Sequence, residues 1–357
     1  MAATDGDVIE VRPDERIDAA RVADFLRDRV EGGDLPLAVR QFGGGHANLT
    51  YLLRYASPDG ARAFEYVLRR PPLGPVAKGA HDMHREYRAL SVLWQAFPYA
   101  PRALVYSDDV SIVGAEFLVM ERRDGVVVRG AVPAVFGGGR DPVANRKLSL
   151  VVVDTLAELH GVDAAALGLD ALGRPDGFLE RQVRGWAERY ERAKTSDDPT
   201  PGEVARWLAD HRPASPPPAL LHNDWKLDNM AVAPDDPGRC VAVYDWDMCT
   251  IGDPLCDLGT TLCSWRAKGD ASEGNPGAMP VGEGFLTDDE GAARYCERTG
   301  TDPAVVPYYQ VFGIFKMGVV IQQIYFRYAQ GQTQDARFAR MDALAHALFA
   351  RAAARRP

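Results

Sequence analysis

The hydrophobic pattern of the chain changes near residue 122, and this change limits the folds that the chain can adopt. Before it, short runs typical of strands alternate with turn signals and accompany two helical segments. After it, most of the chain has the helical period. A strand-rich part followed by a helical part predicts an α+β fold of two lobes, with an N-terminal lobe over 1–121 and a C-terminal lobe over 122–357.

The same patterns place the individual elements. In the N-terminal lobe we expect a small, mostly antiparallel sheet with one helix across it, built from strands at 37–42, 49–55, 64–69, 103–107 and 117–121 and helices at 17–30 and 84–97. In the C-terminal lobe we expect helices at 145–160, 177–194, 305–329 and 336–354, with short apolar strands at 219–221 and 241–244.

The bulk properties exclude some classes of function. The formal net charge of −9 argues against a general nucleic-acid binder, which needs a basic surface. The most apolar stretch, 311–324, contains a lysine and two glutamines and is too short for a bilayer, so we expect a buried helix and no membrane. The acidic N-terminus does not resemble a signal peptide, and five cysteines without close pairs predict reduced thiols in a cytoplasmic protein. The oligomeric state stays open.

The strongest chemical signal is the segment Leu-His-Asn-Asp-Trp-Lys-Leu-Asp-Asn, which contains His222, Asp224 and Asn229. Asp245 follows at the end of a second apolar run, within Tyr-Asp-Trp-Asp. Phosphoryl transfer needs a carboxylate that orients and deprotonates a hydroxyl, and oxygen ligands that hold Mg²⁺ on a triphosphate. Asp224 suits the first role, and Asn229 and Asp245 suit the second.

This pattern resembles the signature of aminoglycoside phosphotransferases, choline kinases and their relatives. It is also similar to the catalytic loop and metal-binding aspartate of protein kinases. The chain has Asp-Trp-Asp where protein kinases have Asp-Phe-Gly, and no Ala-Pro-Glu segment follows, which favours the small-molecule branch. The resemblance covers about 37–265 and implies a protein-kinase-like fold, ATP and Mg²⁺.

The resemblance also assigns supporting residues. We expect His222 to support its loop rather than act as the base, and Asp257 to cap a helix or anchor the catalytic loop. Lys226 and Asp228 stay open, because either side chain could face solvent and Lys226 could also approach a phosphate.

The segment Tyr-Val-Leu-Arg-Arg-Pro resembles the third strand of kinases, with arginine where lysine is usual. Strand alternation puts Val67 and Arg69 on one face and Leu68 and Arg70 on the other. If Val67 contacts adenine, Arg69 points at the phosphates, where a guanidinium can grip two oxygens. Glu86, early on the following helix, is then the natural partner of Arg69, as in the ion pair of kinases.

Two backbone segments complete the predicted nucleotide site. The segment Phe-Leu-Val-Met-Glu resembles the hinge between the lobes, so Met120 and Glu121 should lie at the adenine. The glycine-rich turn between the first two strands is similar to a phosphate-covering hairpin, in which small residues let backbone N–H groups approach phosphate. Its predicted nucleotide contacts are Gly44, Gly45, His46, Ala47 and Asn48.

The sequence therefore predicts an ATP-dependent phosphotransferase that acts on a hydroxyl of a small molecule. One alternative is a nucleotide-binding module without catalysis. Another concerns the acceptor: the Arg69 segment and the Arg-Glu-Tyr after it look closer to kinase-like domains fused to acyl-CoA dehydrogenases, which imply a hydroxyacyl or other metabolite rather than an aminoglycoside. Several aromatic residues of the last hundred positions are candidates for the acceptor pocket or the core: Trp265, Tyr308, Tyr309, Tyr325 and Tyr328.

Overall fold

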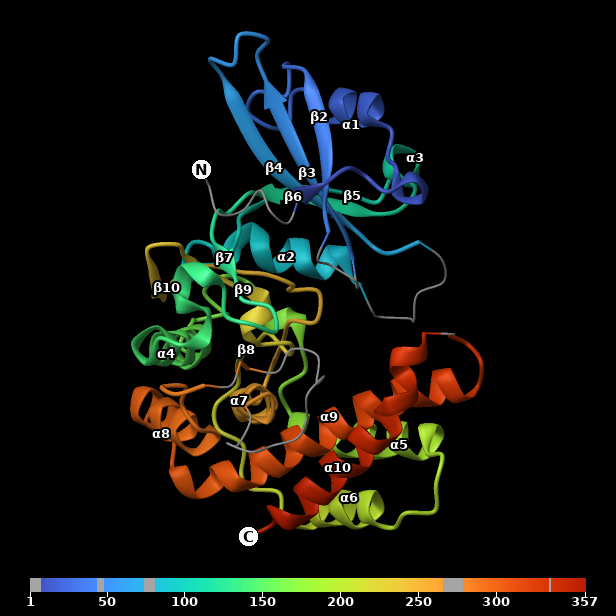
Figure 1. Ribbon diagram of the computed structural model, residues 1–357, viewed down its shortest axis with the longest axis vertical. Helices are drawn as coiled ribbons and strands as arrows, with labels where there is room; N and C mark the ends of the chain where they lie inside the picture. Colours follow the sequence, from blue (N-terminus) through green and yellow to red (C-terminus); the bar gives the residue numbers. More distant parts are fainter. Residues whose placement is uncertain (1–7, 44–47, 74–80, 266–278, 281, 334) are drawn as a thin grey trace. The chain divides into compact units, whose positions relative to one another are not determined.

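The computed structural model describes the whole chain except residues 1–7, 44–47, 74–80, 266–278, 281 and 334 (Figure 1). Its contacts divide the chain into two compact units. The first consists of Met1–Val127 and Met230–Cys249, and the second of Val128–Asn229 and Thr250–Pro357. The predicted lobe boundary after residue 121 stays a prediction.

The first unit contains a six-stranded antiparallel sheet in the order β1-β2-β3-β4-β6-β5. Its strands are β1 (Val8–Ile9), β2 (Leu37–Phe42), β3 (Leu49–Ala56), β4 (Ala63–Arg70), β5 (Ala103–Ser107) and β6 (Phe117–Glu121), with helices α1 (Ala19–Leu26), α2 (Met83–Leu93) and α3 (Val110–Val113). The predicted antiparallel sheet is confirmed, and the last two predicted strands have the predicted bounds. Side chains of Asp18 and Asp82 cap the starts of α1 and α2, and both helices end four residues before their predicted ends.

The two faces of this sheet carry different kinds of side chain, an apolar core on one face and the polar group of Arg69 on the other. Tyr51 pairs with Leu68, and Leu53 pairs with Tyr66, so these side chains share one face, where they form a buried core with residues of α1 and α3. The residues of β4 that alternate with these, Val67 and Arg69, point to the other face of the sheet. Because α2 packs against β5 and β6, Arg69 can meet a side chain of that helix.

The first unit also holds a small antiparallel sheet in the order β10-β9-β7, built from β7 (Val126–Val127), β9 (Met230–Ala233) and β10 (Asp236–Val243). The sequence analysis missed β9 and placed only the end of β10. The reason is that four buried apolar residues, Met230–Ala233, show no alternation from which a strand could be recognised. β9 begins directly after Asn229, and β10 ends two residues before Asp245.

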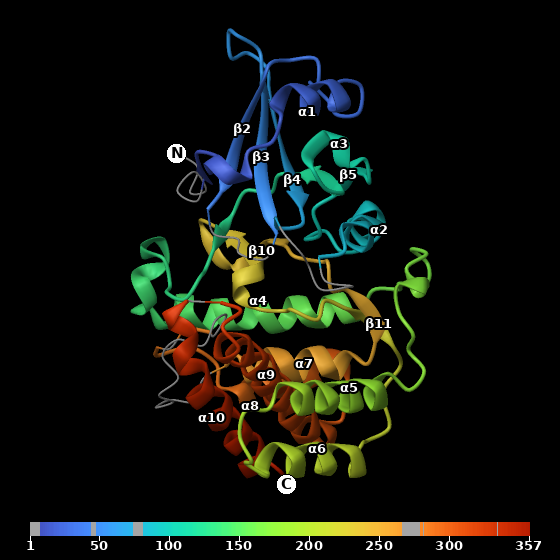
Figure 2. The same cartoon turned by 90° about the vertical axis from the view of Figure 1, so that its right-hand side faces the viewer.

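The second unit is helical. It contains α4 (Pro142–His160), α5 (Phe178–Ala193), α6 (Thr200–Asp210), α7 (Pro254–Cys263), α8 (Asp288–Thr299), α9 (Val306–Ala329) and α10 (Met341–Ala354), with the two-stranded pair β8 (Ala219–Leu221) and β11 (Thr250–Gly252). Helices α5 and α7, both labelled in Figure 2, each contact α9. Helix α6 was not expected from the sequence.

Helix α9 is the core of the second unit. With the turn before it, Pro303–Ala329 is the one helix of the described chain that could cross a membrane by length and composition, but 72% of its apolar window is buried against the protein. The expected buried helix is thus confirmed. The aromatic residues Trp265, Tyr308 and Tyr309 are buried as well, so they serve the core.

Helices α7 and α9 touch through their backbones at two glycines. A Cβ atom built on Gly313 would lie 2.0 Å from the carbonyl oxygen of Gly259, and a Cβ on Gly259 would lie 2.0 Å from the carbonyl oxygen of Tyr309. Only glycine fits at such an approach. Lys316 follows Gly313 by one helical turn, so this crossing places Lys316 beside α7.

Candidate active site

The loop after β8 is anchored by a buried carboxylate. The backbone N–H groups of His222 and Asn223 donate to the two oxygens of Asp257, at 2.7 and 2.9 Å. Asn223 has a left-handed backbone, with φ of 69°, which these contacts help to hold. The Nδ1 atom of the buried His222 accepts from the backbone N–H of Asp224 at 3.2 Å. The structure thus shows the expected contacts of His222 and Asp257 with this loop, and the exclusion of His222 as the base stays a prediction.

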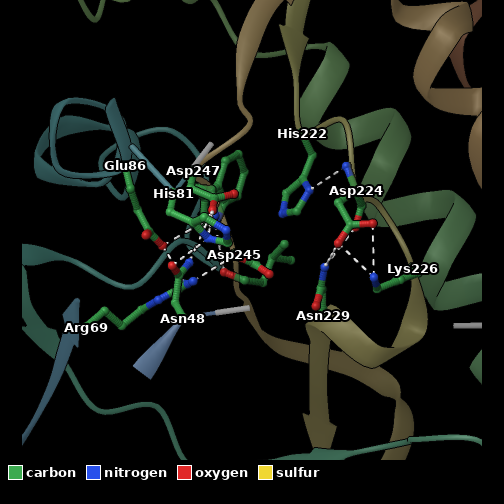
Figure 3. Close-up of polar contacts among 12 residues, drawn as sticks. Asn48, Arg69, His81, Glu86, His222, Asp224, Lys226, Asn229, Asp245 and Asp247 are labelled. Atoms are coloured by element: carbon green, nitrogen blue, oxygen red, sulfur yellow. Dashed lines mark hydrogen bonds and ion pairs between the residues drawn. The ribbon is translucent and has the colours of Figure 1, made fainter. Parts of the chain in front are cut away.

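This loop presents the carboxylate of Asp224 (Figure 3). Lys226 Nζ lies 2.7 and 3.0 Å from its two oxygens. The Asn229 side-chain amide donates to the same carboxylate at 2.8 Å and to the Asp224 carbonyl at 2.9 Å. The Asp224 side chain keeps 37% exposure, so an oriented carboxylate faces an incoming molecule. We call His222, Asp224, Lys226, Asn229 and Asp257 the Asp224 cluster; all lie in the second unit.

A second polar group, in the first unit, surrounds Arg69. Its guanidinium donates to Glu86 Oε1 and to Asp245 Oδ1, both at 2.7 Å, as Figure 3 shows. Glu86 also accepts from the backbone N–H of Trp246 at 3.3 Å. The predicted ion pair of Arg69 with Glu86 is confirmed. Arg70 points to the opposite face and donates to the carbonyl of Val113, so the predicted alternation is confirmed too.

Asn48 joins this second group from the start of β3. Its amide nitrogen donates to Asp247 Oδ2 at 3.2 Å, and its oxygen lies 2.9 Å from His81 Nδ1. Both ends of the buried amide thus contact protein, so Asn48 holds Asp247 and His81. Its predicted nucleotide contact stays a prediction, and the other predicted contacts of that turn, Gly44, Gly45, His46 and Ala47, lie outside the described residues. We call Asn48, Arg69, Glu86, Asp245 and Asp247 the Arg69 cluster.

The Arg69 cluster has an excess of negative charge. One guanidinium faces three carboxylates, Glu86, Asp245 and Asp247. Burial, with a smaller contribution from the charges of Asp245 and Asp247, raises the pKa of Glu86 to about 7 against the opposing effect of Arg69. Burial and the charge of Asp245 also raise the pKa of Asp247. A divalent cation would relieve the repulsion among these carboxylates, so their oxygens suit the binding of such a cation.

Within the described residues, no group of three or more His, Cys, Asp or Glu is arranged as a complete metal site. Magnesium does not need such a cage, because it keeps several waters and binds through one or two carboxylates together with substrate phosphates. Asn229 and Asp245, the predicted ligands, belong to the second and the first unit. Each carries an oxygen suited to a hard cation, and their shared role stays a prediction.

The predicted hinge residues lie at the end of β6. Val67 of β4 pairs in register with Met120, so the two residues predicted at the adenine are neighbours in the sheet. The backbone N–H of Glu121 donates to the carbonyl of Arg102 at 3.0 Å. Any adenine contact made by the Glu121 backbone would therefore use its carbonyl.

The raised pKa of Glu86 predicts a pH dependence of stability. An unfolded glutamate loses its proton near 4.5, whereas folded Glu86 keeps it until about 7, so the folded state binds more protons in between. Stability should then fall as the pH rises from about 4.5 to about 7, by on the order of 3 kcal/mol from this group. Glu86→Gln should make that decline shallower in chemical unfolding across this window. An unchanged slope would show that Glu86 ionises as it does in the unfolded chain.

Sequence reasoning missed two features of these clusters. It did not pair Asn48 with Asp247, because a contact across 199 positions leaves no local pattern. It also treated Lys316 only as an interruption of an apolar stretch, although a single cation in a helix that is otherwise apolar was a signal that the residue has a partner or a ligand.

The fold agrees with the comparisons, which show that the chain belongs to the phosphotransferase enzyme family. The model of that family matches residues 38–291. Among solved structures, a provisionally assigned aminoglycoside phosphotransferase from Ralstonia eutropha is 26% identical, with a TM-score of 0.79 over 95% of this chain and 98% of that one. Choline kinase from Cryptosporidium parvum, 11% identical, has a TM-score of 0.63 over 95% of each chain. The predicted α+β, protein-kinase-like fold class is confirmed.

A curated relative is acyl-CoA dehydrogenase family member 11 of Gallus gallus, which is 33% identical over 335 residues. The match covers 90% of this chain and 41% of that protein, so the chain spans about two fifths of the length of this relative. The predicted resemblance to kinase-like domains fused to acyl-CoA dehydrogenases is confirmed. A third solved structure, a ternary complex of an aminoglycoside phosphotransferase with AMP-PNP and hygromycin B, is 15% identical, with a TM-score of 0.52 over 91% of this chain and 98% of that one.

Proposed function

We propose that the protein transfers the γ-phosphoryl group of ATP to a hydroxyl of a small molecule. The observation that carries this proposal is the partly exposed Asp224 carboxylate, held by Asn229 and Lys226 on an anchored loop. The acceptor oxygen attacks the γ-phosphorus, the bond from that phosphorus to the bridging oxygen breaks, and ADP leaves. Asp224 orients the hydroxyl and takes its proton.

The Arg69 cluster supports binding of the nucleotide. Arg69 carries a permanent charge in a fixed orientation, since Glu86 and Asp245 hold two of its nitrogens. A guanidinium held in this way suits phosphate oxygens, which it contacts through directed N–H groups. The presence of AMP-PNP in the complex with hygromycin B is a further reason to propose ATP for this chain.

Asp245 and Asn229 are the residues that we propose to hold Mg²⁺, with Asp247 close to the first of them in the chain. Mg²⁺ held by these residues would supply positive charge that neutralises charge on the phosphates. The chain contributes the carboxylates whose mutual repulsion favours a cation and the loops that fix them.

This metal assignment predicts the behaviour of Asp245→Asn. Calorimetry should find that Mg²⁺ strengthens ATP binding to the wild type and that this gain is reduced about tenfold or more in the variant, because a ligand charge is lost. Adenosine affinity should change little. Asp235→Asn is a matched control, since Asp235 lies on the surface of the same unit and pairs with Arg239. An equal magnesium gain in both variants would contradict the assignment of Asp245.

The acceptor is the finer part of the proposal. Neighbours in fold include enzymes whose names refer to aminoglycosides and choline, whereas the curated relative is an acyl-CoA dehydrogenase family member. The proposal is tested by measuring ADP formation with a panel of aminoglycosides, choline-like amines, hydroxyacyl thioesters and hydroxy acids. Acceptor-dependent ADP formation with any member supports it. Nucleotide binding without transfer to any member would favour the alternative of a binding module.

A further inference from the structure

Lys316, on α9, is a buried cation for which the described residues provide no ion-pair partner. The residue is 9% exposed. Its Nζ has two polar contacts, the carbonyl of Asn223 at 3.5 Å and Thr260 Oγ1 at 3.4 Å, and both are at the upper limit for a hydrogen bond. Among the described residues, no carboxylate oxygen lies within 4.0 Å of this nitrogen.

This burial of the Lys316 ammonium costs folding free energy, which suggests that the ammonium has a role beyond stability. Burial of a charge is unfavourable unless the charge is paired and hydrogen-bonded, and two long contacts to neutral oxygens do not replace the hydration of an ammonium. Burial lowers the pKa of Lys316, while the more distant charges of Asp257 and Asp224 act in the opposite direction. The backbone contact of α9 with α7 at Gly313 holds the lysine in this place.

Lys316 lies near a second cation and adjoins the loop that carries Asp224. Two cations approach the ring of Trp186 on α5: Lys316 Nζ lies 5.7 Å from its centroid, and the guanidinium of Arg189 lies 4.4 Å from it. Asn223, whose carbonyl Lys316 contacts, directly precedes Asp224. The ammonium therefore contacts the residue before Asp224 and is close enough for the charge of Asp224 to act on it.

We propose that Lys316 forms an anion-binding subsite for the acceptor, so that the acceptor carries a carboxylate or phosphate near the hydroxyl that is phosphorylated. The inference rests on the proposed function and names the class of its substrate. An anionic group supplies the charged partner that the ammonium lacks in the described chain. Aminoglycosides are polycations, and the positive charges of Lys316 and Arg189 would repel them at this point although the whole chain has a net charge of −9.

The test pairs a change in the acceptor with a change in the protein. Short hydroxy acids of varied spacing, their neutral amides, and hydroxy compounds that carry a phosphate are compared in wild type and Lys316→Met. In the wild type an anionic acceptor should have a KM roughly tenfold to hundredfold below that of its amide, as expected for one charge-assisted contact. Lys316→Met should remove this difference by raising KM for the anionic acceptor alone. The carboxylate and phosphate arms identify which anion is used.

Two further variants separate the subsite from other effects. Lys316→Arg keeps the charge and should retain a preference for the anionic acceptor, whereas Lys194→Met makes the same change on the surface of this unit and should leave KM unchanged. If Lys316→Met folds poorly, the wild-type acid and amide pairs still decide the question.

The inference is overturned if wild type treats acid and amide alike, or if Lys316→Met lowers kcat equally for both, which would make the lysine a support of the loop. Transfer to aminoglycosides or amides with none to anionic acceptors would overturn the subsite and leave the proposed phosphotransferase in place. Nucleotide binding without transfer to any acceptor would contradict the proposed function itself, and the subsite with it.

Discussion

Replacement of Asp224 by asparagine should lower phosphoryl transfer about 10²- to 10⁴-fold, the usual contribution of a positioned base. Asparagine preserves the shape of the side chain and an oxygen that can accept from Asn229, but it cannot take the proton of the acceptor. Nucleotide affinity should stay within about twofold of wild type, since Asp224 is assigned to the acceptor and not to the nucleotide. Steady-state turnover and calorimetry with ADP measure the two effects.

The matched control is Asp228→Asn, the same chemical change in the same loop. Asp228 is half-buried, and burial raises the pKa of its carboxyl group. The sequence left its role open, and the structure gives it no part in holding Asp224. We expect at most a few-fold loss of turnover in this variant. A large loss in Asp228→Asn with a small loss in Asp224→Asn would reverse the assignment of the base.

Replacement of Arg69 by methionine should damage both stability and nucleotide binding. At a pH above about 7, where folded Glu86 is ionised, loss of its cationic partner leaves this fully buried carboxylate uncompensated, which typically costs about 3–5 kcal/mol. ATP affinity should also fall roughly tenfold to hundredfold, while adenosine affinity should change much less, because the lost contact is to phosphates. Chemical unfolding and calorimetry measure these changes.

Arg70→Met is the natural comparison, because Arg70 is a neighbouring, buried arginine on the opposite face of β4. Its loss should leave the ratio of ATP to adenosine affinity near the wild-type value. The double variant Arg69→Met with Glu86→Gln should recover part of the lost stability, since the unpaired charge is then gone. An effect on ATP from Arg70→Met as large as that from Arg69→Met would contradict the assignment of the phosphate contact.

The features that the sequence predicted well are those that depend on local patterns. His222, Asp224 and Asn229 lie close together in the sequence, so their spacing can be recognised directly. The placement of Arg69 and Arg70 on opposite faces follows from the alternation of side chains along a strand. The pairing of Arg69 with Glu86 followed from the family pattern and is present in the structure.

The features that the sequence did not reveal depend on tertiary contacts. Strand β9 has four buried residues and no periodicity, so its assignment needs its partners β7 and β10. The place of Lys316 follows from the close approach of Gly313 to Gly259, which no pattern along α9 encodes. The holding role of Asn48 likewise needs the fold to bring Asp247 to it.

The most direct test of the account is to follow the transferred group itself. An acceptor whose hydroxyl carries ¹⁸O is incubated with ATP, Mg²⁺ and the protein, and the product is analysed by mass spectrometry and ³¹P NMR. The account predicts one ADP for each phosphate ester formed, with the label retained in the ester because the acceptor oxygen attacks the γ-phosphorus, and no ester with Asp224→Asn in the same time. Release of inorganic phosphate without any ester, or an equal yield of ester from the Asp224 variant, would contradict it.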